Sequence, residues 1–491
     1  MHKLLGLFLL VGIVCGAAEL RVALSTEPPS LDPTTNAAAV IRLLLQNNLY
    51  ETLVGLDEAG AFRPLLAASW EISEDGRTYT FRLRSGLYFH DGTPCDAEAV
   101  RRSFLRAMDP RGGHVHSRFF ANIEEIEVLD QETVRFMLRK PDAAFLALVA
   151  SGDAVIVPAH RDDLFRHPVG TGPFRFERWD PGYQLRLGRN PMYWDRERPK
   201  VEALVFRFIP DMPSQLAALR NGEVDLLVEV TPEIAQALAA DPRFYVLSAP
   251  QDLVQILAIN KLRAPFGDLR VRQALAYAID RRQLIELVAL GYASPVGSHL
   301  APGTPYYADM TWLYPYDPER AQELLAAAGY PAGFTATLTL PANYPFHVRT
   351  GEVLAAQLAR VGIRLNLKLV DWPTWLEQVY GQVDFDLTVI GHVGRGDPAL
   401  TLAFYGPDRR DYYFRRGWES LELNQLLLLG ATLADPEARH SIYTVAQYLI
   451  AKEVVNVFLL APHRIVVAKI GVHGVSLLSS YVLDLSRASI S

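Results

Sequence analysis

Residues 257–281 read LAINKLRAPFGDLRVRQALAYAIDR and combine the signals of a strand, a turn and a helix. The alternation of Leu257 and Ile259 predicts a short buried strand. Pro-Phe-Gly-Asp at 265–268 predicts a turn, and Asp268 suits the cap of a helix because its carboxylate accepts hydrogen bonds from unpaired backbone N–H groups. Apolar residues then recur at helical spacing, at Leu269, Val271, Ala274, Leu275 and Ala278. The stretch therefore predicts a strand, a turn and a helix within a packed core.

Strand-like and helix-like stretches alternate along the rest of the chain. Apolar or alternating patterns predict strands at 20–24, 78–83, 123–129, 133–138, 174–179, 203–209, 224–228, 363–370, 386–390 and 455–460. Helical periodicity and capping residues predict helices at 37–53, from Asp96 to about residue 108, from Asp317 to Gly329, and at 436–451. Such alternation indicates an α/β architecture in which helices cover the sheets.

The N-terminus has the pattern of a signal peptide over residues 1–18. A basic start is followed by an apolar run too short to cross a bilayer comfortably, and small residues then precede Glu19, before which we expect cleavage. A lipid anchor at Cys15 is the alternative, and it fits less well because Val14 stands where a small residue is expected. We therefore expect a protein exported to the periplasm.

The composition argues against several classes of function. The chain has 491 residues, a formal net charge of −7 and no long basic run, whereas a nucleic-acid-binding protein needs clustered Lys and Arg. It contains no GxSxG, HExxH or Walker motif, so we expect neither an enzyme nor a cofactor. His114 and His116 offer two metal ligands without a third at a suitable spacing, and we expect a surface loop there. After export Cys95 stands alone, and we expect it to be buried.

Seven strings in a fixed order resemble those of one protein family. They are SLDP at 30–33, LLAASW at 65–70, TYTFRLR at 78–84, HDGTP at 90–94, GTGPF at 170–174, RNPMYW at 189–194 and NGEVD at 221–225. With residues 257–281, they make the chain similar to the family 5 extracytoplasmic solute-binding proteins of ABC transporters, which include peptide-, nickel- and opine-binding receptors. The resemblance covers nearly the whole chain after residue 18.

The resemblance implies a two-lobed periplasmic binding protein of type II, with mixed sheets covered by helices and an extra α/β domain. Domain I would comprise residues 19–47, 168–255 and 471–491, domain II residues 48–167, and domain III residues 256–470. The monomer would trap its ligand between the lobes by hinge closure and deliver it to ABC permease subunits in the inner membrane. A secreted hydrolase with an acidic cleft, and a binding protein that feeds a chemoreceptor, are the alternatives.

The resemblance also places a ligand contact in one loop of domain III. In peptide-binding members, an aspartate that meets the ligand's ammonium group lies three residues after a Trp. Counted without gaps, His392 takes the place of this Trp and Arg395 that of the aspartate. The planar guanidinium of Arg suits a carboxylate or phosphate, so we expect Arg395 to recognise an anionic group. A one-residue slip would give the role to Asp397 instead, and a purely structural loop is the third alternative.

The resemblance implies further contacts with the ligand. Trp372 matches a cleft Trp and either stacks on the ligand or only packs domain III. Glu27 lies where relatives approach the ligand, and Phe119 and Phe120 lie where domain II offers an aromatic side chain. Tyr413 belongs to an aromatic and basic cluster that either lines the cleft or forms a solvated turn. The ligand's identity stays open among peptides, opines, sugars, haem and metal chelates.

Overall fold

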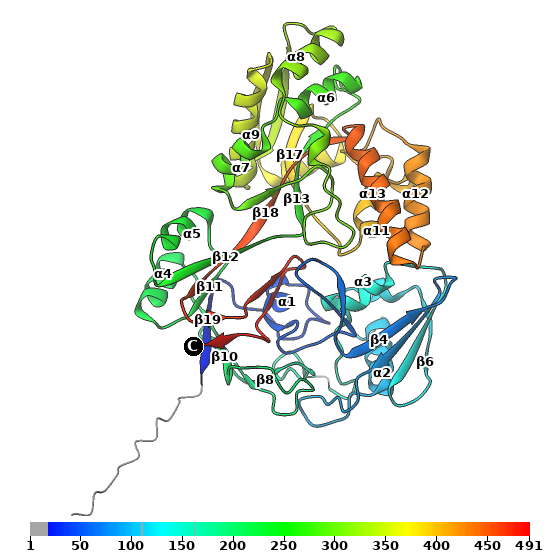
Figure 1. Cartoon of the computed structure of the whole chain (residues 1–491), viewed down its shortest axis with the longest axis vertical. Coiled ribbons are helices and arrows are strands. Elements are labelled where there is room, and N and C mark those ends of the chain that lie inside the picture. The colour runs from blue at the N-terminus through cyan, green and yellow to red at the C-terminus, as the bar shows by residue number, and fades with distance from the viewer. Residues whose placement is uncertain (1–17, 110, 162) are drawn as a thin grey trace, which may run out of the picture.

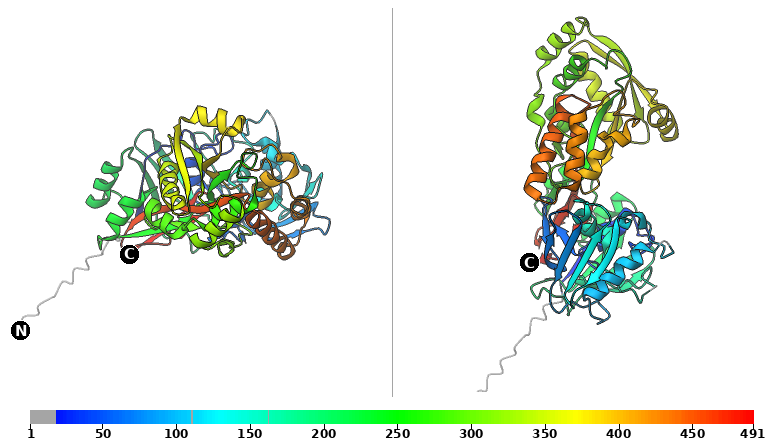
Figure 2. Two further views of the ribbon diagram at one scale, coloured as in Figure 1. Left: turned by 90° about the horizontal axis from the view of Figure 1, so that it is seen from above. Right: turned by 90° about the vertical axis from the view of Figure 1, so that its right-hand side faces the viewer.

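The computed structural model describes residues 18–491 except 110 and 162, so the predicted signal peptide up to residue 17, with Cys15, lies outside the described residues. Figure 1 shows two lobes, one above the other, and the right-hand view of Figure 2 shows the same two lobes from the side. Both lobes contain sheets covered by helices, as the sequence predicts. No helix in the described part of the chain is both long and apolar enough to cross a membrane.

The main sheet of the lower lobe is built around β1 (Glu19–Leu24), whose apolar side chains are buried. β1 lies between two parallel neighbours, which is typical of a strand covered on both faces. The other strands of this part of the sheet are β8 (Phe174–Asp180), β9 (Gln184–Arg189), β10 (Ala203–Phe208), β11 (Leu226–Val228) and β12 (Phe244–Pro250). The helices beside it are α1 (Ala39–Leu45), α4 (Met212–Asn221) and α5 (Pro232–Ala239).

A second, antiparallel sheet completes the lower lobe. Its strands, in spatial order, are β4 (Ala67–Ile72), β5 (Thr78–Leu83), β7 (Thr133–Leu138) and β6 (Ile123–Val128). α2 (Ala97–Met108) packs on this sheet, and its cap Asp96 accepts a hydrogen bond from the backbone of Ala99, as expected. Smaller elements around it are β2 (Val54–Leu56), β3 (Phe62–Pro64) and α3 (Phe145–Ala150). Cys95 is buried in the core beside them, as predicted.

The upper lobe contains the decisive stretch. β13 (Leu253–Ile259) is buried, and after the turn Asp268 accepts a hydrogen bond from the backbone of Arg270 at the start of α6 (Leu269–Tyr277). The other strands of this lobe are β14 (Ala293–Pro295), β15 (Phe334–Pro341), β16 (Ile363–Val370) and β17 (Leu387–Val393). Its helices are α7 (Arg281–Ala289), α8 (Pro318–Ala327), α9 (Pro345–Ala359), α10 (Trp372–Trp375), α11 (Pro398–Thr401), α12 (Leu421–Thr432) and α13 (Pro436–Lys452).

One long strand joins the lobes. β18 (Asn456–Lys469) pairs with β13 in the upper lobe and with β12 and β11 in the lower lobe. The segment between β12 and β13, at residues 251–252, crosses between the lobes beside it. The buried core residues form separate clusters, and each cluster draws its buried members from one lobe. After β18, the short strands β19 (Val472–His473), β20 (Ser476–Leu478), β21 (Val482–Asp484) and β22 (Ser489–Ile490) return to the lower lobe.

Two predicted elements were wrong in length. The helix predicted at 37–53 ends at Leu45, because Gln46 is extended and Asn47 adopts a left-handed backbone with φ of 64°, which Asn tolerates better than most residues. The Asn48 amide then donates to the carbonyl of Leu44 and helps to end the helix. The strand predicted at 455–460 continues to residue 469 as β18, because the residues after 460 find new partners in the lower lobe.

Candidate ligand-binding site

The loop after β17, at residues 394–397, is held in place by hydrogen bonds to α11 and to the segment 251–252 that crosses between the lobes. The backbone N–H of Gly394 donates to the carbonyl of Asp252, over 2.8 Å, and that of Arg395 donates to the hydroxyl of Thr401, over 3.1 Å. Asp397 caps α11 by accepting a hydrogen bond from the backbone of Ala399. The loop is therefore fixed at both ends, and the exposed Arg395 side chain extends from a defined backbone.

Arg395 carries a positive charge that no carboxylate of the described residues neutralises. Its guanidinium carbon lies 4.9 Å from the centre of the Phe404 ring, an arrangement in which the cation is attracted to the face of the ring. Within the described residues, the guanidinium forms no ion pair with a carboxylate. It is thus held in position by an aromatic ring while its N–H donors stay free for an anion.

Asp397 is placed very differently from Arg395. Its two carboxylate oxygens accept hydrogen bonds of 2.6 and 2.8 Å from Arg439 of α13, and the Asp397 and Arg439 side chains are 0% and 2% exposed. A carboxylate enclosed in this way has a structural partner and no free face toward solvent. Of the two positions that the alignment leaves open, Arg395 is the one available to a ligand, and the ligand role of Asp397 stays a prediction that we do not carry further.

His392 and Tyr413 form a pair beneath the loop. The His392 Nε2 and the Tyr413 hydroxyl share a hydrogen bond of 2.6 Å, and their rings are nearly parallel. His392 is half-buried, and desolvation lowers its pKa to about 3, so its imidazole is neutral at physiological pH. Tyr413 is only 2% exposed. The pair therefore supports the loop and adds no charge to it.

Trp372 is connected to the pair of His392 and Tyr413 through a second tryptophan, Trp375. Its ring stacks on Trp375 with a centroid distance of 5.0 Å and an interplanar angle of 8°, and Trp375 in turn contacts Tyr413 edge-on at 5.7 Å. Trp372 is half-buried, so part of its ring is packed and part faces solvent. The structure thus brings Trp372, His392, Arg395 and Tyr413 together in the upper lobe, and Trp372 keeps both its packing role and its predicted ligand role.

Comparison with known proteins identifies the family of the chain. The model of the bacterial extracellular solute-binding proteins, family 5 Middle, matches residues 61–410. The glutathione-binding protein GsiB of Shigella dysenteriae serotype 1 is 30% identical over 458 residues, which cover 91% of this chain and 89% of that protein. The chain belongs to family 5 of the bacterial extracellular solute-binding proteins. The resemblance inferred from the sequence is therefore confirmed, and the family is one of binding proteins that serve ABC importers.

Two solved structures show how this family 5 protein compares with others in shape. The nickel ABC transporter protein of Bacillus halodurans is 26% identical with a TM-score of 0.82, over 95% of this chain and 98% of that one. The periplasmic binding protein DppA of Helicobacter pylori, in complex with the peptide STSA, is 27% identical with a TM-score of 0.67, over 96% and 98%. Both match the present chain over its two lobes.

The remaining predicted residues of this family 5 protein lie in the lower lobe. The Glu27 carboxylate accepts hydrogen bonds from the Trp179 indole, over 2.8 Å, and from the backbone of Gly182. Phe119 is 50% exposed and Phe120 is 0% exposed. Glu27 thus fastens the turn between β8 and β9, Phe119 presents half its surface to solvent, and Phe120 packs the core. None of the three roles in ligand binding is tested, and they stay predictions.

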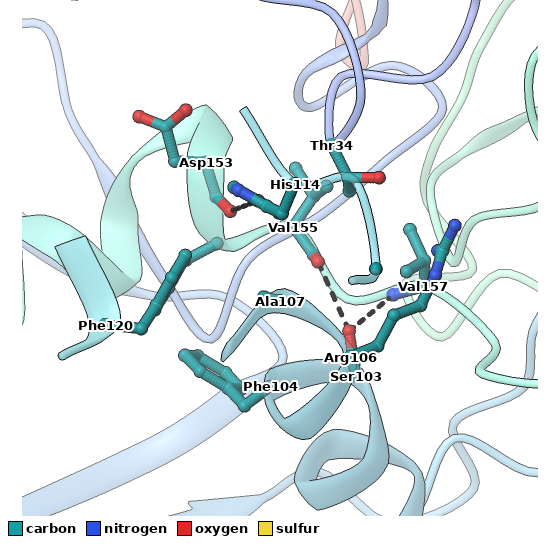
Figure 3. A pocket seen from close by; sticks show the side chains of 12 residues that line it. Thr34, Ser103, Phe104, Arg106, Ala107, His114, Phe120, Asp153, Val155 and Val157 are labelled. Carbon is teal, nitrogen blue, oxygen red and sulfur yellow. Dashed lines mark hydrogen bonds between the residues drawn. The ribbon is translucent and has the colours of Figure 1, made fainter. Parts of the chain in front are cut away.

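Figure 3 shows the small cavity that Phe120 lines, inside the lower lobe. Two of its polar side chains bond the backbone, because Ser103 accepts a hydrogen bond from the N–H of Val157 and His114 bonds the carbonyl of Asp153. The expectation of a surface loop at the histidines was wrong for His114, which is 7% exposed. Its burial follows from the packing of its ring edge-on against Phe120.

Sequence reasoning missed several residues around the loop. Phe404, Arg409 and Asp252 belong to no motif, and each reaches the loop from another part of the chain. The Asp252 carboxylate lies against Gly394, where an added Cβ would overlap it. Burial raises the pKa of Asp252 to about 6, and a hydrogen bond from the backbone of Gly396 partly offsets this rise. The sequence offers only one weak signal for Phe404, which is that an aromatic residue follows shortly after the loop.

Proposed function

We propose that this protein captures a small peptide-like or other anionic solute between its two lobes, closes by hinge motion and delivers the solute to ABC permease subunits in the inner membrane. We further propose that it acts as a periplasmic monomer after removal of residues 1–18. In the proposed domain division, residues 19–47, 168–255 and 471–491 form domain I, residues 48–167 domain II and residues 256–470 domain III.

The observation that carries the proposal is the unpaired guanidinium of Arg395. An Arg fork binds a carboxylate through two parallel hydrogen bonds, and at this position it would repel the ammonium group of an ordinary peptide. His392 beside it is neutral at physiological pH, so the positive charge at this point of the loop comes from Arg395 itself. The name of the relative GsiB states that it binds glutathione, a peptide-like solute with two carboxylates, and such a solute matches the chemistry of Arg395.

Two observations support the hinge motion. The DppA structure with bound peptide superposes less well on this chain than the nickel protein does, with TM-scores of 0.67 and 0.82, although the sequence identities are 27% and 26%. A global difference at equal identity is what a different angle between two rigid lobes would produce. The lobes also have separate cores, so each can move without repacking its interior.

The experiment that tests the proposed function is native mass spectrometry of the protein purified from periplasmic extract without denaturation. The expected result is a stoichiometric small-molecule adduct whose composition gives it a net negative charge at neutral pH. The variant Arg395→Gln should lose this adduct, whereas Arg410→Gln, which removes an exposed charge nearby, should keep it. A ladder of ordinary neutral or cationic peptides, or an unchanged adduct in Arg395→Gln, would overturn the proposal.

A further inference from the structure

At the candidate site, the guanidinium groups of two arginines both lie near the ring of Phe404. The guanidinium carbon of Arg395 lies 4.9 Å from the centre of the Phe404 ring, and that of Arg409 lies 5.9 Å from the same point. Both arginines are exposed and Phe404 is half-buried. They come from separate segments, since Arg395 precedes α11 and Arg409 ends the short turn Pro407–Arg409. The fold therefore brings two positive charges to one ring.

Tyr412 lies at the same place. The centroid of its ring lies 4.8 Å from that of Phe404 and 5.6 Å from that of Tyr380. Burial raises the pKa of Tyr412 to about 12, Tyr380 adds to this rise, and the charges of Arg395 and Arg409 both oppose it. Both guanidiniums thus act on Tyr412, whose hydroxyl is neutral at physiological pH.

In the described part of the chain, this pair of charges has no carboxylate partner. Within the described residues, neither Arg395 nor Arg409 forms an ion pair with a carboxylate. The nearby Asp397 is committed to Arg439, and the exposed Asp408 and Asp411 form no ion pair with Arg409 in this part of the structure. Two like charges held at one aromatic surface repel each other, and an anionic partner for each would relieve this repulsion.

We propose that Arg395 and Arg409, with Phe404 and Tyr412 beside them, form a paired-cation site that selects peptide-like solutes carrying two carboxylates. This inference rests on the proposed function and adds a second ligand-binding residue and a narrower class of ligand. Each guanidinium takes one carboxylate, Phe404 holds both guanidiniums beside its ring, and Tyr412 donates to one of the carboxylates. A solute with one anionic group leaves one guanidinium unpaired and binds less tightly.

The test is isothermal titration calorimetry of the mature chain with two probes, reduced glutathione and its glycyl monoethyl ester, which lacks one carboxylate. We expect wild-type protein to bind glutathione at least about tenfold more tightly than the ester, because a hydrogen-bonded charge pair is lost with the ester. Arg409→Gln should bind glutathione at least about tenfold more weakly than wild type and lose the preference over the ester. Arg410→Gln removes the adjacent exposed charge and should keep both.

The outcomes separate this inference from the proposed function. If Arg395→Gln loses glutathione binding and Arg409→Gln behaves as wild type, the proposed function stands and the paired site is rejected. If wild-type protein binds the ester as tightly as the acid, or binds neither probe at about 1 mM, a range in which weak complexes are still detected, the class of ligand proposed here is rejected. Because Arg409 is exposed, circular dichroism and the melting temperature should be unchanged in its variant.

Discussion

Glu51 is a buried carboxyl group that has three hydrogen-bond donors and no ion pair among the described residues. Its oxygens accept from the Tyr193 hydroxyl at 2.7 Å, the Thr171 hydroxyl at 3.0 Å and the Trp194 indole at 3.3 Å. Desolvation raises the pKa of Glu51 from 4.5 to about 7, and the three hydrogen bonds only partly offset it. Because Thr171, Tyr193 and Trp194 follow Glu51 by more than a hundred residues, this one side chain ties distant parts of the lower lobe together.

The raised pKa predicts that Glu51 makes the protein less stable as the pH rises. The folded state prefers the protonated acid, so no cost arises below the unfolded pKa near 4.5, and a cost grows as the pH rises toward the folded pKa of about 7. A shift of this size corresponds to roughly 3 kcal/mol. Glu51→Gln keeps the shape of the protonated acid, so its free energy of unfolding should fall less than that of wild type between pH 5 and pH 8.

Urea denaturation of both proteins at the two pH values measures this difference. Glu125→Gln is a suitable control, because Glu125 is an exposed carboxylate in the same lobe and should leave the pH dependence as it is in wild type. An equal loss of stability in wild type and Glu51→Gln would contradict the assignment of the titration to Glu51. The hydrogen-bond donors to Glu51 come from distant segments of the chain, so the spacing of residues in the sequence could not predict this buried acid.

At the scale of elements, the buried pair of Asp397 and Arg439 fixes α11 against α13. Asp397 is both the cap of α11 and the acceptor of two hydrogen bonds from Arg439, which also donates to the carbonyl of Gly430 in α12. Asp397→Ala leaves a guanidinium buried without its carboxylate, which costs roughly 3–5 kcal/mol. We expect the midpoint of urea denaturation to fall accordingly.

A second variant of the same residue separates charge from capping. Asp397→Asn keeps an oxygen for the cap and removes the charge, so it should lose a large part of the stability that Asp397→Ala loses. A loss below about 1 kcal/mol in both variants, as is typical of an exposed pair, would show that the ion pair does not hold these helices. The measurement therefore decides whether Asp397 belongs to the architecture of the site.

Elements with a complete local signal were predictable from the sequence, and those shaped by distant partners were not. The helix after Asp96 and the strand at 363–370 agree with α2 and β16, because caps and alternation are read within the segment itself. β18 extends beyond its predicted end because it pairs with strands of both lobes. In the same way, the position of Arg395 could be predicted from the sequence. The contacts of Arg395 and Arg409 with Phe404 could not, because they depend on the fold.

At the scale of the whole molecule, contacts outside β18 also join the lobes, and two of them are of the kind that can break. Arg349 of α9 in the upper lobe forms an ion pair of 3.1 Å with Glu233 of α5 in the lower lobe, and both side chains are about half exposed. The backbone N–H of Ala143 in the lower lobe donates to the carbonyl of Ala431 in the upper lobe. Such contacts add little free energy, so a ligand held by both lobes can change the angle between them.

The ion pair offers a test of which lobe arrangement the structure represents. If this arrangement is the open one, as the lower TM-score against a ligand-bound relative supports, then Arg349→Gln removes a contact that favours the open state. The closed fraction then rises, and the affinity for glutathione should increase by no more than about fivefold, the limit for an exposed pair.

Small-angle X-ray scattering should show a smaller radius of gyration on addition of glutathione in both wild type and Arg349→Gln, but not in Arg395→Gln. A weaker affinity in Arg349→Gln would mean that the pair survives in the closed state and stabilises it, because a contact can shift the equilibrium only toward the state that contains it.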